Sequence, residues 1–214
     1  MLPVAIIERM HEAHRRWIWS LLLALTIAGI VTPSSAQSPA PAPPATAPVN
    51  PDDADVKPGT PGKDVIFLPT PPEVVSAMLD LAKVTASDVV YDLGSGDGRT
   101  PIAAATEHGA RGVGVEFNPK LVALSRLNAE KAGVADRVRF INADLFETDL
   151  SEASVVTLYL LGSLNQRLLP KLRKELKPGS RIVSHAFTMG DEWKPDAERT
   201  VNGKTIYLWI VPPQ

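Results

Sequence analysis

The sequence contains no cysteine, which excludes disulfide bonds, thiolate metal sites and a cysteine nucleophile. Neither sign of charge predominates, since 22 Lys and Arg stand against 24 Asp and Glu for a net charge of −2. The chain therefore lacks the basic excess that is typical of nucleic-acid-binding proteins. What it does have is a hydrophobic fraction of 44%, which is ordinary for a globular protein with a packed core.

Residues 1–36 have the order of a targeting segment. Arg15–Arg16 precede the apolar run Trp17–Val31, and the small residues Ser34 and Ala36 follow at the positions that a cleavage site requires. The run is shorter than the about 20 residues of a membrane-spanning helix. We predict a signal peptide or a short N-terminal anchor, and hence a protein that is exported to the periplasm, secreted or held at a membrane.

Two acidic residues make this leader unusual. Glu8 and Glu12 lie in the part that is normally basic, and a start at Met10 would remove Glu8. The start of translation, at Met1 or Met10, and the cleavage of the leader are therefore open.

The segment 37–62 is rich in Pro, Ala, Asp and Thr and has almost no large apolar residue. Such a segment cannot bury enough surface to offset the entropy lost on ordering it. We predict a disordered spacer, partly in the polyproline II conformation, and a folded domain over 63–214.

Within this domain, short β-rich runs alternate with helical patterns. The near-continuous hydrophobicity of the runs indicates strands that are covered on both faces, and the alternation predicts βαβ units with a mostly parallel sheet. The expected strands are 88–93, 112–117, 138–143, 154–160 and 181–187, and the expected helices are 71–84, 99–109, 118–134 and 163–179.

Several helix ends carry their own signals. Asn118 is expected to cap a helix that has Pro119 in its first turn, and Gly109 to end the helix before it. Pro170 either kinks its helix or starts a second one.

The end of the domain departs from the alternation. Asn202–Gly203 lies between two β-type segments, and this dipeptide is a strong hairpin signal. We therefore predict an α/β fold with a Rossmann-like, doubly wound, mostly parallel seven-stranded sheet and a C-terminal antiparallel hairpin. That topology is typical of Rossmann-like methyltransferases rather than of nicotinamide dehydrogenases.

A glycine-rich loop, "DLGSGDG", follows the first expected strand. Ligands of such sheets bind beyond the carboxyl ends of the strands. The spacing G-x-G-x-G differs from the G-x-G-x-x-G of dinucleotide sites. Asp92 and Asp97 in the loop would repel a pyrophosphate but suit a sulfonium or ammonium group, which favours S-adenosylmethionine over NAD.

Two further acids follow the next strands. Glu116 ends the second expected strand, where a carboxylate can accept hydrogen bonds from both ribose hydroxyls. Asp144 follows the third strand and suits a hydrogen bond to the adenine amino group, with Leu145 packing on the ring. The acids therefore stand in register at successive strand ends.

The motifs "DLGSGDG", "GVGVEFNP" and "NADLF" resemble the cofactor motifs of class I S-adenosylmethionine-dependent methyltransferases. The resemblance implies that the cofactor is bound by residues of these motifs and by the "FLPTP" loop, which in the family closes over the methionine end. The residues expected to bind it are Thr70, Asp92, Gly94, Ser95, Gly96, Asp97, Gly98, Glu116, Phe117, Asn118, Asp144 and Leu145.

A wider resemblance extends from Leu68 to Val211. "LPTPPEVVSAML", "VVTLYLLGSLNQRLLPKLRKELKPGSRIVSHAF" and "MGDEW" are similar to the protein-lysine methyltransferases that in eukaryotes modify the mitochondrial ATP synthase c-subunit and the adenine nucleotide translocase. The resemblance implies a protein lysine as methyl acceptor, with membrane proteins among the candidates. Gly162–Ser163 stands where relatives often have Pro-Glu, a departure that bears on the acceptor pocket.

Candidate catalytic residues lie after the fourth expected strand. Tyr159 is either a wall of the acceptor site or part of the core, and Asn165 either accepts from the amine or caps the next helix. His185 fits an interior histidine better than a base. Thr70 either belongs to the loop over the cofactor or caps the first helix, and Phe67 is expected to pack near this loop.

Other chemistries are disfavoured. There is no "DPPY"-type motif of base-amine methylation, and no His, Asp and Glu cluster has the spacing of a metal site. We expect no nucleic-acid partner and no metal. The rivals are methylation of a small molecule at nitrogen or oxygen, and a non-catalytic exported module that binds the cofactor. An exported location conflicts with the cytosolic origin of S-adenosylmethionine.

Overall fold

The computed structural model describes residues 66–213. The predicted leader, the predicted spacer and the first residues of the predicted domain lie outside this range. No helix within 66–213 is long and apolar enough to cross a membrane. The described elements are α2 (Pro72–Leu81), β1 (Val89–Leu93), α3 (Arg99–His108), β2 (Arg111–Glu116), α4 (Pro119–Lys131), β3 (Val138–Asn142), β4 (Val155–Leu158), α5 (Gly162–Glu175), β5 (Arg181–His185), β6 (Ala197–Val201) and β7 (Lys204–Ile210).

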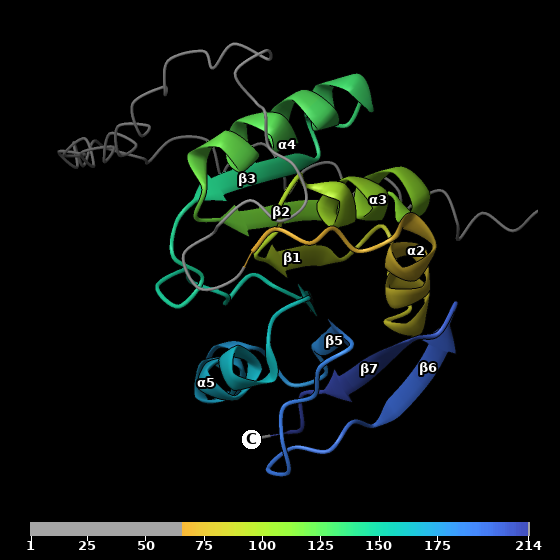
Figure 1. The fold of residues 1–214 in the computed structure, drawn as a ribbon, viewed down its shortest axis with the longest axis vertical. Coiled ribbons are helices and arrows are strands. Elements are labelled where there is room, and N and C mark those ends of the chain that lie inside the picture. Colours follow the sequence, from red (N-terminus) through yellow and green to blue (C-terminus); the bar gives the residue numbers. More distant parts are fainter. Residues whose placement is uncertain (1–65, 214) are drawn as a thin grey trace, which may run out of the picture. The chain divides into compact units, whose positions relative to one another are not determined.

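The strands form one seven-stranded sheet in the order β3-β2-β1-β4-β5-β7-β6 (Figure 1). The first five strands in the chain pair in parallel, whereas β7 pairs antiparallel with both β5 and β6. Asn202 and Gly203 join β6 to β7 with φ of 48° and 73°, as a tight hairpin requires. The predicted fold class and hairpin are confirmed.

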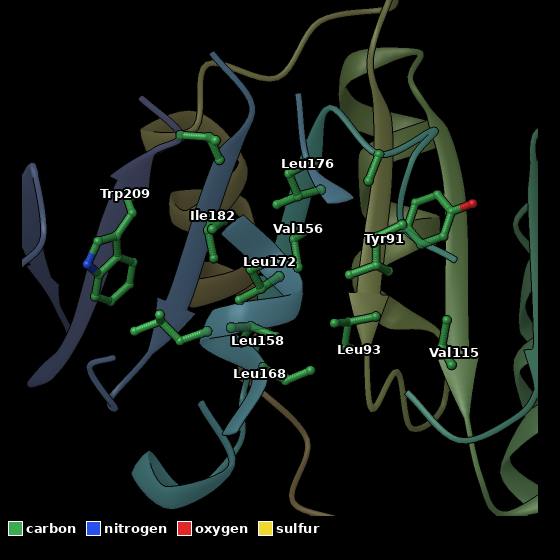
Figure 2. Packing of buried hydrophobic residues seen from close by; sticks show 14 of the residues in the cluster. Tyr91, Leu93, Val115, Val156, Leu158, Leu168, Leu172, Leu176, Ile182 and Trp209 are labelled. Atoms are coloured by element: carbon green, nitrogen blue, oxygen red, sulfur yellow. The ribbon is translucent and has the colours of Figure 1, made fainter. Parts of the chain in front are cut away.

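Helices cover both faces of the sheet, as the apolar strands predicted. The side chains of Val74, Val75 and Leu79 from α2 pack with Val90 of β1 and Val183 of β5 on one face. The other face carries α5, and Figure 2 shows its leucines beside the strands. The buried cluster on that face includes Tyr91, Leu93, Val156, Leu158, Leu168, Leu172, Ile182 and Trp209.

The strand order makes a switch point between β1 and β4. The chain runs outward from β1 to β2 and β3, and then returns to place β4 on the other side of β1. The loops after β1 and β4 therefore diverge at the carboxyl edge and leave a crevice between them.

Two predicted helix ends are confirmed. Asn118 Oδ1 accepts a hydrogen bond from Lys120 N at 3.0 Å, with Pro119 in the first turn. Gly109 ends α3 in the left-handed conformation at φ 69°. Pro170 lies inside a single helix, α5, so no second helix begins there.

The N-cap of α2 is Pro71, and no side chain caps this helix. The interpretation of Thr70 as a capping residue is therefore wrong, since its hydroxyl is directed elsewhere. Asn165 likewise caps nothing, because α5 begins after Leu161, again with no side-chain cap.

Candidate functional site

A pocket with about 960 Å³ of empty space, part of it open to solvent, lies at the carboxyl edge of the sheet. Its walls come from the segment 66–70 before α2 and from the segments that follow β1, β2, β3 and β4. Among the predicted cofactor residues, the pocket is lined by Thr70, Asp92, Gly94, Ser95, Gly96, Asp97, Glu116, Phe117, Asp144 and Leu145. Gly98 and Asn118 are not part of this lining.

The glycine loop is shaped by close packing as well as by backbone freedom. Gly96 has φ 55°, and a Cβ there would lie 2.5 Å from the Phe67 ring. Gly98 has φ 81°, and its Cβ would meet Phe140 at 2.6 Å. Neither position admits a side chain. Gly98 therefore serves the packing of the loop on the sheet, whereas Gly96 lets the loop and Phe67 meet at the pocket wall.

Asp92 is the most deeply buried acid of the pocket, with 7% of its surface exposed. Its Oδ1 accepts a hydrogen bond from Thr157 Oγ1 at 2.7 Å, and Thr100 also bonds its side chain. Burial outweighs these bonds and raises the pKa of Asp92 to about 6, and the charges of Asp97 and Glu116 act in the same direction. An uncompensated buried carboxylate of this kind favours a cationic ligand.

Asp97, the second acid of the loop, is paired within the chain. Arg99 donates from Nε and Nη2 to the two carboxylate oxygens of Asp97, at 2.9 and 2.7 Å. Arg99 Nη1 also donates to the backbone oxygen of Thr70 at 2.8 Å. The charge of Asp97 is thus largely offset, so the preference of the loop for a cation rests on Asp92 rather than on both acids. The same guanidinium ties the glycine loop to the segment before α2.

Glu116 braces the glycine loop from the end of β2. Its Oε2 accepts from Gly96 N at 3.0 Å and its Oε1 from Asn118 N at 2.8 Å. Burial is the largest influence and raises the pKa of Glu116, against these backbone bonds. Each carboxylate oxygen has a second lone pair, so the side chain can brace the loop and still accept bonds from a ligand's hydroxyl groups.

The far end of the pocket is formed after β3. Asp144 Oδ1 accepts from Phe146 N at 2.9 Å, which fixes the carboxylate at the pocket wall. Leu145 lies beside it in the lining. Phe117 is 51% exposed and stands at the rim. Two apolar side chains and a carboxylate acceptor thus line the same pocket, a set of groups that suits a flat heterocycle with an amino group.

The opposite end of the pocket follows β4. Tyr159 lines it and stacks on the ring of His185, with centroids 3.9 Å apart. Asn165 is fully buried outside the lining, where its Nδ2 donates to the backbone oxygens of Phe187 and Thr188 at 3.2 and 3.4 Å. The structure thus brings Tyr159 to the pocket, whereas Asn165 holds the loop after β5.

Known proteins are similar to this chain in sequence. The sequence model of the ANTKMT methyltransferase domain matches residues 92–197. A protein-lysine N-methyltransferase of Saccharolobus islandicus is 45% identical over 152 residues, which are 69% of this chain and 94% of that protein. The chain belongs to this methyltransferase family.

A solved structure agrees with the assignment. A protein from Salinibacter ruber, described as an RNA methyltransferase and solved with S-adenosyl-L-homocysteine, is 56% identical with a TM-score of 0.67, and the match covers 69% of this chain and 95% of that one. The adenine nucleotide translocase lysine N-methyltransferase of Mus musculus is 42% identical, but over 56% of this chain and only 51% of its own length. The chain thus spans about half of this animal relative.

The chain is an S-adenosylmethionine-dependent methyltransferase, and its pocket fits this cofactor. The buried carboxylate of Asp92 suits the cationic methionine end. Glu116 can accept from hydroxyl groups, and Asp144 with the apolar Leu145 and Phe117 suits the adenine. A pyrophosphate, in contrast, would lie next to Asp92 and Glu116. Neither of these acids forms an ion pair with a Lys or Arg among residues 66–213, so their negative charge would repel it.

Arg99 and Thr157 support the site but were missed by the sequence interpretation. Arg99 follows the glycine loop and could have been found, because it lies two positions from the acid it pairs. Thr157 lies in β4 and reaches Asp92 only because β4 pairs beside β1. The interpretation of His185 as an interior histidine is confirmed, since it is 1% exposed, but nothing local in the sequence indicates its contacts with Thr70 and Tyr159.

Proposed function

We propose that this methyltransferase modifies lysine side chains of proteins at nitrogen. The observation that carries the proposal is the 45% identity to a protein-lysine N-methyltransferase over 94% of that protein's length. A match over nearly a whole relative includes the acceptor side of the pocket as well as the cofactor side. The protein substrates themselves, membrane proteins among them, belong to the proposal.

We further propose how the side chains hold the cofactor. Asp92 neutralises its cationic end, Glu116 accepts from the ribose, and Asp144 with Leu145 and Phe117 receives the adenine. When bound, S-adenosylmethionine supplies a methyl group on a positively charged sulfur, which is already activated for displacement. The task of the chain is therefore to position two reactants and to exclude water.

The acceptor nitrogen must lose its proton before it reacts, because the ordinary pKa of a lysine is about 10.4. The end of the pocket that follows β4, where we place the acceptor, is lined by Tyr159 and by the apolar Leu160 and Leu164. Such walls lower the pKa of an amine by desolvating its charged form. The neutral nitrogen then forms the new N–C bond as the C–S bond breaks, and the electron pair of that bond stays on sulfur.

A second candidate is methylation of RNA, because the Salinibacter ruber protein at 56% identity is described as an RNA methyltransferase. Charge argues for the protein substrate. The whole chain has a net charge of −2 and a pI of about 6.1, whereas RNA binding is dominated by contacts of Lys and Arg with phosphates.

One experiment separates the candidates. The full chain is incubated with methyl-labelled S-adenosylmethionine and extracts of cells that lack the gene, and each sample is divided for protease or ribonuclease treatment. We expect label that protease releases and that mass spectrometry assigns to lysine. Label that ribonuclease releases would mean that RNA is the substrate and would replace the proposal. Label that leaves the sample on dialysis, in a product other than the cofactor, would indicate a small-molecule acceptor. Tight cofactor binding without turnover on any extract would indicate a binding module.

We also propose that residues 1–36 direct the protein out of the cytosol or anchor it at a membrane. The basic-apolar-small order of this segment supports the proposal. A fusion of residues 1–62 to a reporter that is active only outside the cytosol tests it. A fusion that is present in the cells but shows no reporter activity, whether translated from Met1 or from Met10, would overturn it.

A further inference from the structure

His185 lies directly behind the wall of the pocket. It is the last residue of β5, is 1% exposed and is not part of the pocket lining. Its side chain contacts two residues that do line the pocket, Thr70 and Tyr159. Its Nδ1 is 3.2 Å from Thr70 Oγ1, and its ring stacks on Tyr159 with an interplanar angle of 27°.

These two contacts belong to different parts of the site. Thr70 is held through its backbone oxygen by Arg99, which also pairs with Asp97 of the glycine loop. Tyr159 lies at the end of the pocket that faces the proposed amine. The series Asp97, Arg99, Thr70, His185 and Tyr159 therefore connects the cofactor loop with the acceptor wall, and the histidine is the one member that touches both sides.

The backbone after His185 supports a functional role for this corner. Ala186 has φ 65°, an unfavourable conformation for a residue with a Cβ, and Phe187 N donates back to His185 O at 2.9 Å. This tight turn brings the Phe187 ring to 6.4 Å from that of Tyr159. Asn165 holds the same turn through Phe187 O. A strained turn that is held from a neighbouring helix is expected where geometry matters more than stability.

We propose that His185 is a positioning residue for both sides of the site: its hydrogen bond to Thr70 holds the cofactor side, and its stacking on Tyr159 holds the acceptor wall. This inference rests on the proposed function, because it gives Tyr159, on which the Phe187 ring stacks, the role of orienting the lysine side chain. It assigns to His185 no direct contact with either reactant.

The chemistry of histidine suits this position. A phenylalanine could stack but not bond, and an asparagine could bond but not stack. Burial, with a contribution from the charge of Lys204, lowers the pKa of His185 to about 4. The ring is therefore neutral at physiological pH and does not repel a cationic cofactor or an approaching ammonium group.

The test separates the two contacts. His185→Phe keeps the stack and loses the hydrogen bond, so the Kd of S-adenosyl-L-homocysteine, measured by calorimetry, should rise about tenfold. The amount of extract protein that half-saturates methylation at saturating cofactor should change less than twofold. His185→Asn keeps a polar group near Nδ1 and loses the ring, so the half-saturating amount should rise about tenfold and the Kd less than twofold.

His108→Asn is the matched control. His108 is half-buried, and its Nε2, like that of His185, has no hydrogen-bond partner within 66–213. It lies at the C-terminal end of α3, away from the pocket lining. The substitution should change neither constant. Thr70→Val, combined with His185→Phe, should raise the Kd no further than either single change, because both remove the same bond.

Two results would overturn the inference. If both His185 variants alter the two constants by the same factor, with a lower melting temperature, the residue is merely structural. If neither variant differs from the His108→Asn control, His185 positions neither side of the site. Either result leaves wild-type turnover on lysine intact, whereas failure of the proposed function removes that turnover itself.

Discussion

The two ends of the pocket are built in different ways. At the cofactor end, acids stand at the ends of successive parallel strands, and each is supported by backbone amides or hydroxyls close by, as Glu116 is by Gly96 N and Asp92 by Thr157. At the acceptor end, an aromatic ring from the segment after β4 stacks on one from the turn after β5, and Asn165 and His185 hold these segments from outside the lining.

This difference follows from what each end must do. The cofactor is one invariant cation, and a buried charge with fixed partners recognises it strongly. The proposed acceptor is a flexible side chain that must arrive neutral and correctly aimed, which apolar and aromatic walls favour. Changes at the first end should therefore act on cofactor affinity, and changes at the second on the use of the acceptor.

The largest effect is expected from Asp92→Asn. Loss of the buried negative charge should weaken S-adenosylmethionine binding by a factor of about 100 or more, as calorimetry would measure. Glu130→Gln, which removes an exposed acid of α4, should leave the affinity unchanged. An Asp92→Asn variant that binds normally would contradict the role given to this carboxylate.

The same substitution should stabilise the ligand-free protein. Because the pKa of Asp92 is raised to about 6 from an ordinary 3.8, the folded chain holds a proton that the unfolded chain has lost between these values. Ionised Asp92 therefore costs about 1–3 kcal/mol above pH 6, and the cost fades as the pH falls toward 4. At pH 7.5 the melting temperature of Asp92→Asn should be higher than that of the wild type. Near pH 4 the two melting temperatures should be equal.

Tyr159→Ala should have the next largest effect, and at the other end. Removing the ring that stacks on His185 should lower methylation at limiting acceptor by about 30-fold. The Kd of S-adenosyl-L-homocysteine should change less than threefold. Tyr159→Phe keeps the stack and serves as the control. Equal losses of cofactor affinity and acceptor use in Tyr159→Ala would erase the division between the two ends.

Cofactor binding should depend on pH. Below pH 6, Asp92 gains a proton and can no longer neutralise a cation, so affinity at pH 5 should be about tenfold below that at pH 7.5. Calorimetry across this range checks the slope. Glu116, whose pKa is also raised, should act in the same direction. An affinity that stays flat to pH 5 would show that Asp92 remains ionised.

The smallest effect is expected from Ala186→Gly. Glycine adopts a positive φ without strain, so the melting temperature should rise, in line with a gain of about 1 kcal/mol. The looser turn should raise the half-saturating amount of acceptor about threefold, through Phe187, and leave cofactor affinity unchanged. Ala132→Gly, at the C-cap of α4 where φ is −80°, should give no such gain in stability.

Much of the cofactor end could be predicted from short stretches of sequence. The glycine spacing, Asp92 at the end of a strand and the Asn202–Gly203 hairpin are local patterns, in which a residue's neighbours in the chain decide its conformation. Even there, the sequence did not indicate that Asp97 is paired with Arg99, so that only Asp92 of the two loop acids remains to attract a cation.

The acceptor end could not be predicted in this way. Thr70 and His185 are 115 positions apart and meet only because α2, which follows Thr70, packs on the face of the sheet that includes Val183 of β5. The sequence predicts a capping or catalytic role for Asn165, whereas in the structure its side chain donates to the backbone of the loop after β5. Strand order decides such contacts, and strand order is a property of the whole sheet.

By itself, the sequence determined the fold class, the family and the acids that suit a cationic methyl donor, because periodicity, turn chemistry and motif spacing act over a few residues. Only the tertiary structure decided which of those acids are paired within the chain, and that a buried histidine joins the two ends of the pocket. Burial and charge pairing depend on segments that are distant in the chain and adjacent in the folded sheet.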